Sequence, residues 1–107
     1  MNDKINEIAN NLRARLKNSF NDFEGLYVFG SQVNGKAADD SDIDVVAIID
    51  ALSDDKKMGI IWNIVGKIEY EYNVIFDLHP MTRAELERNY IFHNEVVNKG
   101  VFYGASQ

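Results

Sequence analysis

Residues 43–50 restrict the fold of this chain more than any other segment, because they carry its clearest strand pattern. Successive side chains of a strand point to opposite faces of a sheet. One face carries Ile43, Val45, Ala47 and Ile49, and the other carries Val46 and Ile48, preceded by Asp44 and Asp42. The first face predicts contact with a hydrophobic core. The second face brings two carboxylates together at the start of the strand, where both can point toward one cation.

Two other short segments have the composition of strands. Residues 26–29 (Leu-Tyr-Val-Phe) are apolar, aromatic and β-branched, which predicts a buried strand that ends at Gly30. Residues 74–78 predict a third strand that is stopped by Pro80. Asp77 lies on the face of this third strand opposite its apolar residues, and a lone carboxylate inside such a run needs an explanation.

Apolar residues at helical spacing account for much of the remaining chain. The predicted helices cover residues 2–19, 32–38, 54–72 and 82–99. Ser53 is the expected N-cap of the third helix, and residues 82–85 have the capping-box spacing that starts the fourth. Gly100 is expected to end the fourth helix. A chain of 107 residues without a linker or repeat therefore predicts one α/β domain, residues 1–107, whose helices cover a sheet.

Composition argues against nucleic-acid binding, disulfide bonds and a membrane-spanning segment. A net charge of -6 with scattered basic residues argues against nucleic acid, which needs a clustered basic face. The absence of cysteine excludes disulfides and thiolate chemistry and suits a reducing cytoplasm. The longest apolar run, residues 45–49, is too short to cross a membrane, and charged residues near the N-terminus break any signal-peptide core.

The segment from Gly30 to Asp44 combines two elements of phosphate chemistry. Gly30 allows close backbone approach to a phosphate, and Ser31 offers a hydroxyl and an amide where a helix begins. Mg²⁺ is commonly held by one or two carboxylates together with substrate phosphates, which suits Asp42 and Asp44. Asp77 on a neighbouring strand is the best candidate for the third carboxylate of a two-metal site.

Other interpretations of these residues are weaker. Residues 39–42 also have the composition of a solvated turn, but that interpretation leaves Asp44 and Asp77 unexplained. An EF-hand starting at Asp40 fails, because its sixth position is Val45 instead of glycine and its twelfth is alanine.

A P-loop is also conceivable, because residues 30–36 fit G-x-x-x-x-G-K after a strand. The residue that follows is Ala37, which lacks the hydroxyl that a P-loop supplies to Mg²⁺. His79 shares the predicted face of Asp77, although a histidine just before Pro80 is more often structural than functional.

Gly30-Ser31, the ten residues 32–41 and Asp42-Ile43-Asp44 together resemble the signature of the nucleotidyltransferase superfamily of DNA polymerase β type. The short chain, Gly35 in the turn, Ser41 before the first aspartate and residues 99–104 look most like the minimal nucleotidyltransferases. The resemblance covers most of the chain. It implies a polymerase β palm-like fold with a small mixed β-sheet.

The resemblance also implies a reaction in which a hydroxyl attacks the α-phosphorus of a Mg²⁺-bound nucleoside triphosphate. Asp42 and Asp44 would bind two Mg²⁺ ions, and Asp77 would bind the catalytic ion and accept the hydroxyl proton. Gly30 and Ser31 would hold the β- and γ-phosphates. Many minimal members are antitoxins that transfer AMP from ATP to a tyrosine of a partner HEPN toxin, and this is the leading specific expectation.

The loop after the serine departs from the family pattern. Family members often have arginines two positions apart here, whereas this chain has Gln32 and Asn34. Lys36 can replace one of the missing charges, but it lacks the bidentate geometry of arginine. A catalytically weak nucleotide-binding module that neutralises a partner by contact alone is therefore the alternative.

Overall fold

The computed structural model describes residues 2–35 and 41–106 and contains one mixed, four-stranded sheet. Its strands are β1 (Gly25–Phe29), β2 (Ile43–Ile48), β3 (Phe76–Met81) and β4 (Val101–Gly104), in the spatial order β3-β2-β1-β4. β1 is antiparallel to both β2 and β4, whereas β2 and β3 are parallel. The expectation of an α/β protein with a small mixed sheet is confirmed.

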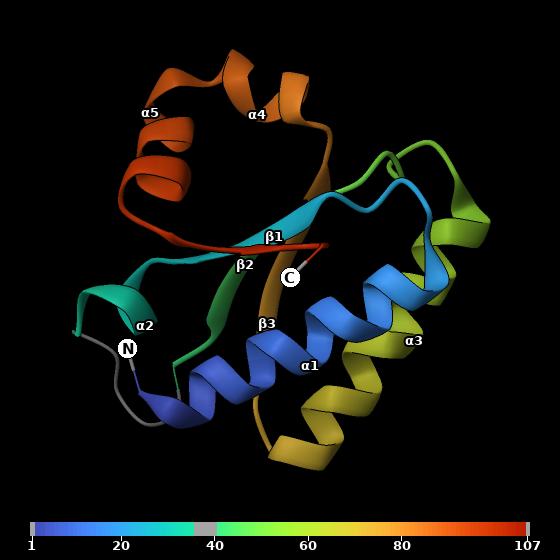
Figure 1. The fold of residues 1–107 in the computed structure, drawn as a ribbon, viewed down its shortest axis with the longest axis horizontal. Coiled ribbons are helices and arrows are strands. Elements are labelled where there is room, and N and C mark those ends of the chain that lie inside the picture. The colour runs from blue at the N-terminus through green and yellow to red at the C-terminus, as the bar shows by residue number, and fades with distance from the viewer. Residues whose placement is uncertain (1, 36–40, 107) are drawn as a thin grey trace.

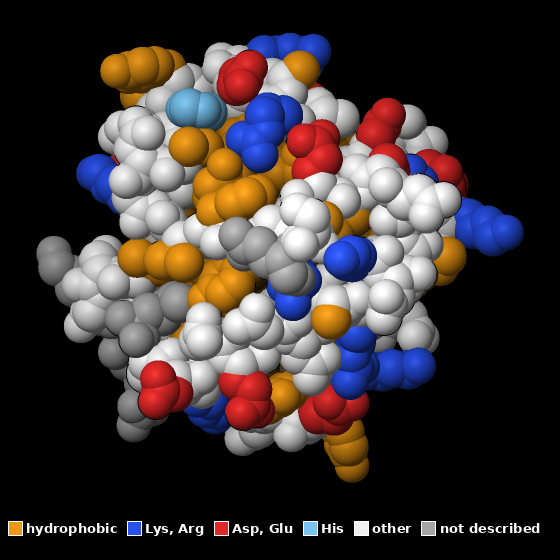
Figure 2. Space-filling model, viewed as in Figure 1, with side chains coloured by type: hydrophobic (Ala, Val, Ile, Leu, Met, Phe, Trp, Pro, Cys, Tyr) orange, Lys and Arg blue, Asp and Glu red, His pale blue; other side chains and the backbone are white. Residues whose placement is uncertain are grey.

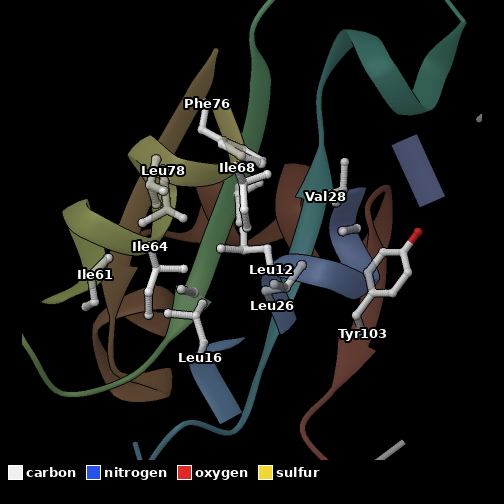
Figure 3. Close-up of a cluster of buried hydrophobic side chains, with 14 of the residues drawn as sticks. Leu12, Leu16, Leu26, Val28, Ile61, Ile64, Ile68, Phe76, Leu78 and Tyr103 are labelled. Atoms are coloured by element: carbon white, nitrogen blue, oxygen red, sulfur yellow. The ribbon is translucent and has the colours of Figure 1, made fainter. Parts of the chain in front are cut away.

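Helices α1 (Asp3–Ser19) and α3 (Asp55–Tyr72) pack together against one face of the sheet (Figure 1). The Asn2 side chain caps α1, and the Asp54 side chain caps α3 by accepting a hydrogen bond from the Lys57 amide. The prediction that Ser53 caps the central helix was one residue early, because Asp54 supplies the carboxylate. Between these helices and the sheet lies the main core (Figure 3), which includes Leu12, Leu16, Leu26, Val28, Ile61, Ile64, Ile68, Phe76, Leu78 and Tyr103.

A smaller helical layer covers part of the opposite face. It consists of α4 (Arg83–Arg88), α5 (Tyr90–His93) and a π-helical turn, η1 (Asn94–Asn98). A second buried cluster beneath it contains Tyr27, Val46, Ile48, Leu86 and Val96. Both faces of β1 and β2 are therefore covered over most of their length.

The predicted single helix over residues 82–99 is wrong in its continuity. Thr82 and Glu85 do form the expected capping box at its start. The helix then breaks at Asn89, whose backbone is extended and whose side chain accepts a hydrogen bond from the Phe92 amide, so that Asn89 caps a new helix. An asparagine suits such a position because its short polar side chain satisfies the free amides of a first turn.

The predicted stop of the third strand at Pro80 is also wrong, because β3 starts at Phe76 and runs through Pro80 to Met81. The carbonyls of Ile75 and Met81 accept hydrogen bonds from β2 and the residue after it. Since alternate residues of a strand bond to the same neighbour, the nitrogen of Pro80 faces the free edge of the sheet. Proline costs no ladder hydrogen bond at that position.

Two smaller differences concern short elements. Helix α2 covers only Ser31–Asn34 and ends at Gly35 in the left-handed conformation, with φ of 78°; the remainder of the predicted 32–38 helix lies outside the described residues. Strand β4 was not predicted, because its four residues fit equally well with an apolar tail. No helix within residues 2–35 and 41–106 is long and apolar enough to cross a membrane.

Candidate active site

Asp44 and Asp77 lie side by side on neighbouring strands. The register of the sheet pairs Phe29 of β1 with Asp44 of β2, and pairs Asp44 with Asp77 of β3. These three side chains form a row across the second face of the sheet, beyond the cluster that α4 and η1 cover. The end of β1, the start of β2 and the start of β3 therefore meet at one place, as a site built from the Gly-Ser turn and the aspartates requires.

The row concentrates negative charge. Partial burial raises the pKa of Asp44 above its ordinary value, and the charges of Asp77 and Asp42 raise that pKa further. His79 acts in the opposite direction and lowers the pKa of Asp44. Without a cation, ionisation of Asp44 is thus less favourable than that of a free aspartate, because of desolvation and like-charge repulsion.

Gly30 has two reasons to be glycine. Its φ of 76° and ψ of -148° lie in a region that is essentially restricted to glycine. A Cβ atom at Gly30 would also collide with Oδ2 of Asp44 and come within 3.2 Å of its Cγ. The turn that precedes Ser31 therefore passes directly against the Asp44 carboxylate, which brings the candidate phosphate-binding backbone next to the candidate metal ligand.

Gln32 has a structural partner that the sequence did not reveal. Its Nε2 donates a hydrogen bond to the backbone oxygen of Ser41, at 3.1 Å. This contact joins helix α2 to the residue that precedes Asp42. No arginine occupies position 32 or 34, and Lys36 lies outside the described residues.

The other predicted site residues that the structure describes border this row in the sequence: Ser31 starts α2 directly after Gly30, and Ser41 precedes Asp42. Asp42 immediately precedes β2 and is exposed, and Gly35 ends α2 with no atom within 4 Å of the position that a Cβ would take. Among the described residues, no three carboxylate or imidazole groups converge closely enough to enclose a metal ion by themselves. Asp44 and Asp77 lie opposite each other on neighbouring strands, whereas Asp42 lies just before the start of β2.

A metal ion fits the chemistry of this donor set. Three carboxylates whose charges repel one another gain stability from a divalent cation, and oxygen donors suit Mg²⁺. An incomplete protein cage is consistent with Mg²⁺, which normally keeps several waters and substrate phosphates as ligands. Asp42, Asp44 and Asp77 are thus the residues that could hold it.

Aromatic side chains pack together beside Asp44 and Asp77, and the sequence did not predict this cluster. Phe92 of α5 contacts Phe29 edge to face, with ring centroids 5.6 Å apart, and contacts His79 in the same manner at 6.2 Å. His79 also places Nε2 at 3.2 Å from Oδ1 of Asp77. The sequence indicates that Phe29 lies near the site, because Phe29 directly precedes Gly30. Nothing in the sequence links Phe92 to this site.

Two surface features lie elsewhere. A hollow of about 440 Å³ is lined by residues of α3 alone, between Trp62 and Tyr70, and contains none of the aspartates. On the face drawn in Figure 2, the Lys and Arg side chains of the described residues are scattered among acidic ones instead of forming a basic stripe. This distribution gives no footprint for a nucleic-acid backbone on that face.

With the fold and the row of carboxylates established, the class of protein follows from a match over residues 5–101 to the nucleotidyltransferase domain. The chain belongs to this family. All of the predicted site residues lie within the matched segment. No curated protein matches the chain.

Solved structures with the same fold include toxin–antitoxin complexes. One, a toxin-antitoxin with AMP-PNP, shares 22% identity with a TM-score of 0.58, over 92% of this chain and 68% of that chain. Another contains a tri-AMPylated HEPN toxin from Shewanella oneidensis in complex with an MNT antitoxin, at 19% identity and a TM-score of 0.58, over 91% and 69% of the two chains.

A third similar structure is a putative nucleotidyltransferase from Sulfolobus solfataricus. It shares 18% identity and a TM-score of 0.53, and the match covers 96% of this chain and 88% of that chain. At these identities the similarity establishes the fold alone.

Proposed function

We propose that this protein is a Mg²⁺-dependent nucleotidyltransferase, with residues 1–107 as a single catalytic domain. The observation that carries the proposal is the placement of Asp44 beside Asp77 in the sheet, with the Gly30 turn packed against Asp44. Carboxylates that would bind a metal and a turn that would bind a phosphate thus meet at one point. This is the geometry that attack at a nucleotide phosphorus needs.

Each residue then has a role in the proposed reaction. Asp42 and Asp44 would hold two Mg²⁺ ions, and Asp77 would hold one of them and accept the proton of the attacking hydroxyl. Bound Mg²⁺ supplies charge neutralisation at the attacking and leaving oxygens. Gly30 and Ser31 would hold the β- and γ-phosphates, while Gly35, Lys36 and Ser41 would complete the nucleotide contacts around the loop.

The specific reaction we propose is transfer of AMP from ATP to a tyrosine hydroxyl of a HEPN-type toxin, which this protein would counteract as an antitoxin in the cytoplasm. Support comes from the structural neighbours, which include a complex of an MNT antitoxin with an AMPylated HEPN toxin and a toxin–antitoxin complex with AMP-PNP.

The proposal is tested with a co-purified partner, Mg²⁺ and ATP labelled at the α-phosphate. We expect covalent label on the partner, and we expect the label to disappear with Asp42→Ala and with Asp44→Ala. Asp50→Ala is the matched control, because Asp50 is an exposed aspartate just beyond the other end of β2. Label at wild-type levels with Asp44→Ala would refute the assigned site.

The second candidate function is a binding module that neutralises its partner by covering it. The absence of arginine at positions 32 and 34 favours this candidate, and the Gln32 amide is already engaged by Ser41. The same experiment separates the two functions. Full neutralisation of the partner by both aspartate variants, without any label, would support the binding module and contradict the enzyme.

A further inference from the structure

We infer that His79 is a positioning residue that fixes the orientation of the Asp77 carboxylate. The inference rests on the proposed function, in which Asp77 is a metal ligand. It adds a residue that lies outside the Gly-Ser and Asp-x-Asp motifs. It also gives a role to an imidazole that sequence considerations alone favour as structural.

His79 and Asp77 are in direct contact. Nε2 of His79 lies 3.2 Å from Oδ1 of Asp77, two residues earlier on the same face of β3. Because a carboxylate only accepts hydrogen bonds, Nε2 carries the hydrogen. That hydrogen is present in the imidazolium and in one neutral tautomer, so the contact does not require a charged histidine.

The imidazole has support on its other side. The sheet register places His79 beside Val46, in the row directly behind Asp44 and Asp77. Phe92 contacts the His79 ring edge to face, with an interplanar angle of 81°, and Phe92 is itself held against Phe29. A ring held in this way can restrain the carboxylate it contacts, although both partners are on the surface with side chains 44% and 55% exposed.

The contact with His79 restricts the orientation of the Asp77 carboxylate. An exposed aspartate on an edge strand rotates freely unless a neighbour holds it. With Oδ1 engaged by His79, the carboxylate keeps one orientation beside Asp44, in which it would bind a cation and accept the proton of an attacking hydroxyl. Hydrogen-bonded partners of this kind orient metal-binding carboxylates, and their loss typically lowers metal affinity by about 10-fold to 100-fold.

The competing explanation is that His79 only fills space against Phe92. Two substitutions separate packing from hydrogen bonding. His79→Phe keeps a ring against Phe92 but removes the N–H donor, whereas His79→Gln loses the ring but keeps a donor at similar reach. Because the side chain is substantially exposed, we expect both variants to fold, which thermal unfolding checks.

The test is the affinity for Mn²⁺, used as a spectroscopic substitute for Mg²⁺ and measured by electron paramagnetic resonance on the full chain without nucleotide. We expect His79→Phe to weaken Mn²⁺ binding by about 10-fold. His79→Gln should restore the affinity to within about threefold of wild type. In an Asp77→Asn background, His79→Phe should have no further effect, because the carboxylate on which it acts is gone.

The outcomes are distinct. Equal Mn²⁺ affinity of wild type and His79→Phe would overturn the role of His79 while leaving the metal site intact. Weak binding in both His79 variants would also overturn it, in favour of ring packing. Absence of Asp44-dependent Mn²⁺ binding in the wild type would overturn the metal site itself, and the inference about His79 with it.

Discussion

At the scale of single residues, the candidate site depends on the contact between Gly30 and Asp44. The sequence predicts both residues as parts of one motif but not that they touch. The structure shows that the turn leaves no room for a side chain at position 30. The position of the Asp44 carboxylate therefore requires a glycine at position 30, in addition to the proposed approach of a phosphate.

Gly30→Ala is expected to destabilise the protein by at least about 2 kcal/mol, because it combines a strained backbone conformation with a collision against Asp44. Urea unfolding measures this change. Gly35→Ala is the matched control, since Gly35 also has a positive φ of 78° but no atom within 4 Å of an added Cβ. We expect that control to cost only about 1 kcal/mol. Equal costs for the two variants would show that the Asp44 contact is unimportant.

Asp44→Asn is expected to stabilise the metal-free protein while abolishing nucleotidyl transfer. The pKa of Asp44 in the folded state lies above its ordinary value of 3.8. The folded state therefore loses stability as the pH rises from 3.8 through the folded-state pKa. The asparagine variant does not titrate there. Its advantage should therefore be small near pH 4 and larger at pH 7, and it should stay modest because the side chain is partly exposed to solvent.

Thermal unfolding at both pH values, with and without Mg²⁺, measures this effect. Added Mg²⁺ should stabilise the wild type and leave Asp44→Asn unchanged. A variant that is less stable than wild type at pH 7 without metal would show that Asp44 is not under electrostatic strain.

Some residue-level contacts follow from the sequence and others do not. Spacing along a strand predicts that Asp44 and Asp77 each lie on the face opposite the main core, because alternation is a local property. Contacts between side chains on different elements are not local. The hydrogen bond from Gln32 to Ser41 and the edge-to-face contact of Phe92 with His79 depend on how segments pack in three dimensions.

At the scale of elements, the helical layer over the second face of the sheet differs most from expectation. A capping box and helical spacing predict one helix, but the chain forms α4, α5 and a π-helical turn. Asn89 competes with the continuing helix because its side chain can cap a new one. The break at Asn89 changes the direction of the chain, so that Phe92 of α5 contacts Phe29 and His79.

Asn89→Ala is expected to destabilise the protein by about 1 kcal/mol, because the amide of Phe92 loses its capping partner. Asn89→Asp keeps an oxygen at the same position and should stay within a few tenths of a kcal/mol of wild type. Urea unfolding and hydrogen exchange at the Phe92 amide measure the two effects. Unchanged exchange at Phe92 in Asn89→Ala would show that the cap does not hold α5.

At the scale of the whole molecule, the fold places the site where three strands and the second helical layer meet. In the order β3-β2-β1-β4, the neighbours β2 and β3 are parallel, and the whole of α3 lies between them in the sequence. Sequence patterns predict the individual strands β1 and β2 and the helices α1 and α3. They cannot give the order of strands, which long-range packing decides.

The central claim is that the row of Asp44 and Asp77 beside Gly30 directs attack at the α-phosphorus of a nucleotide. The release of pyrophosphate from ATP, in the presence of Mg²⁺ and the partner, tests this claim most directly, because attack at the γ-phosphorus would release phosphate instead. We predict pyrophosphate release that falls about 100-fold or more in Asp44→Asn and Asp77→Asn but not in the control Asp50→Asn. Release of phosphate alone, or equal rates in all four proteins, would contradict the account.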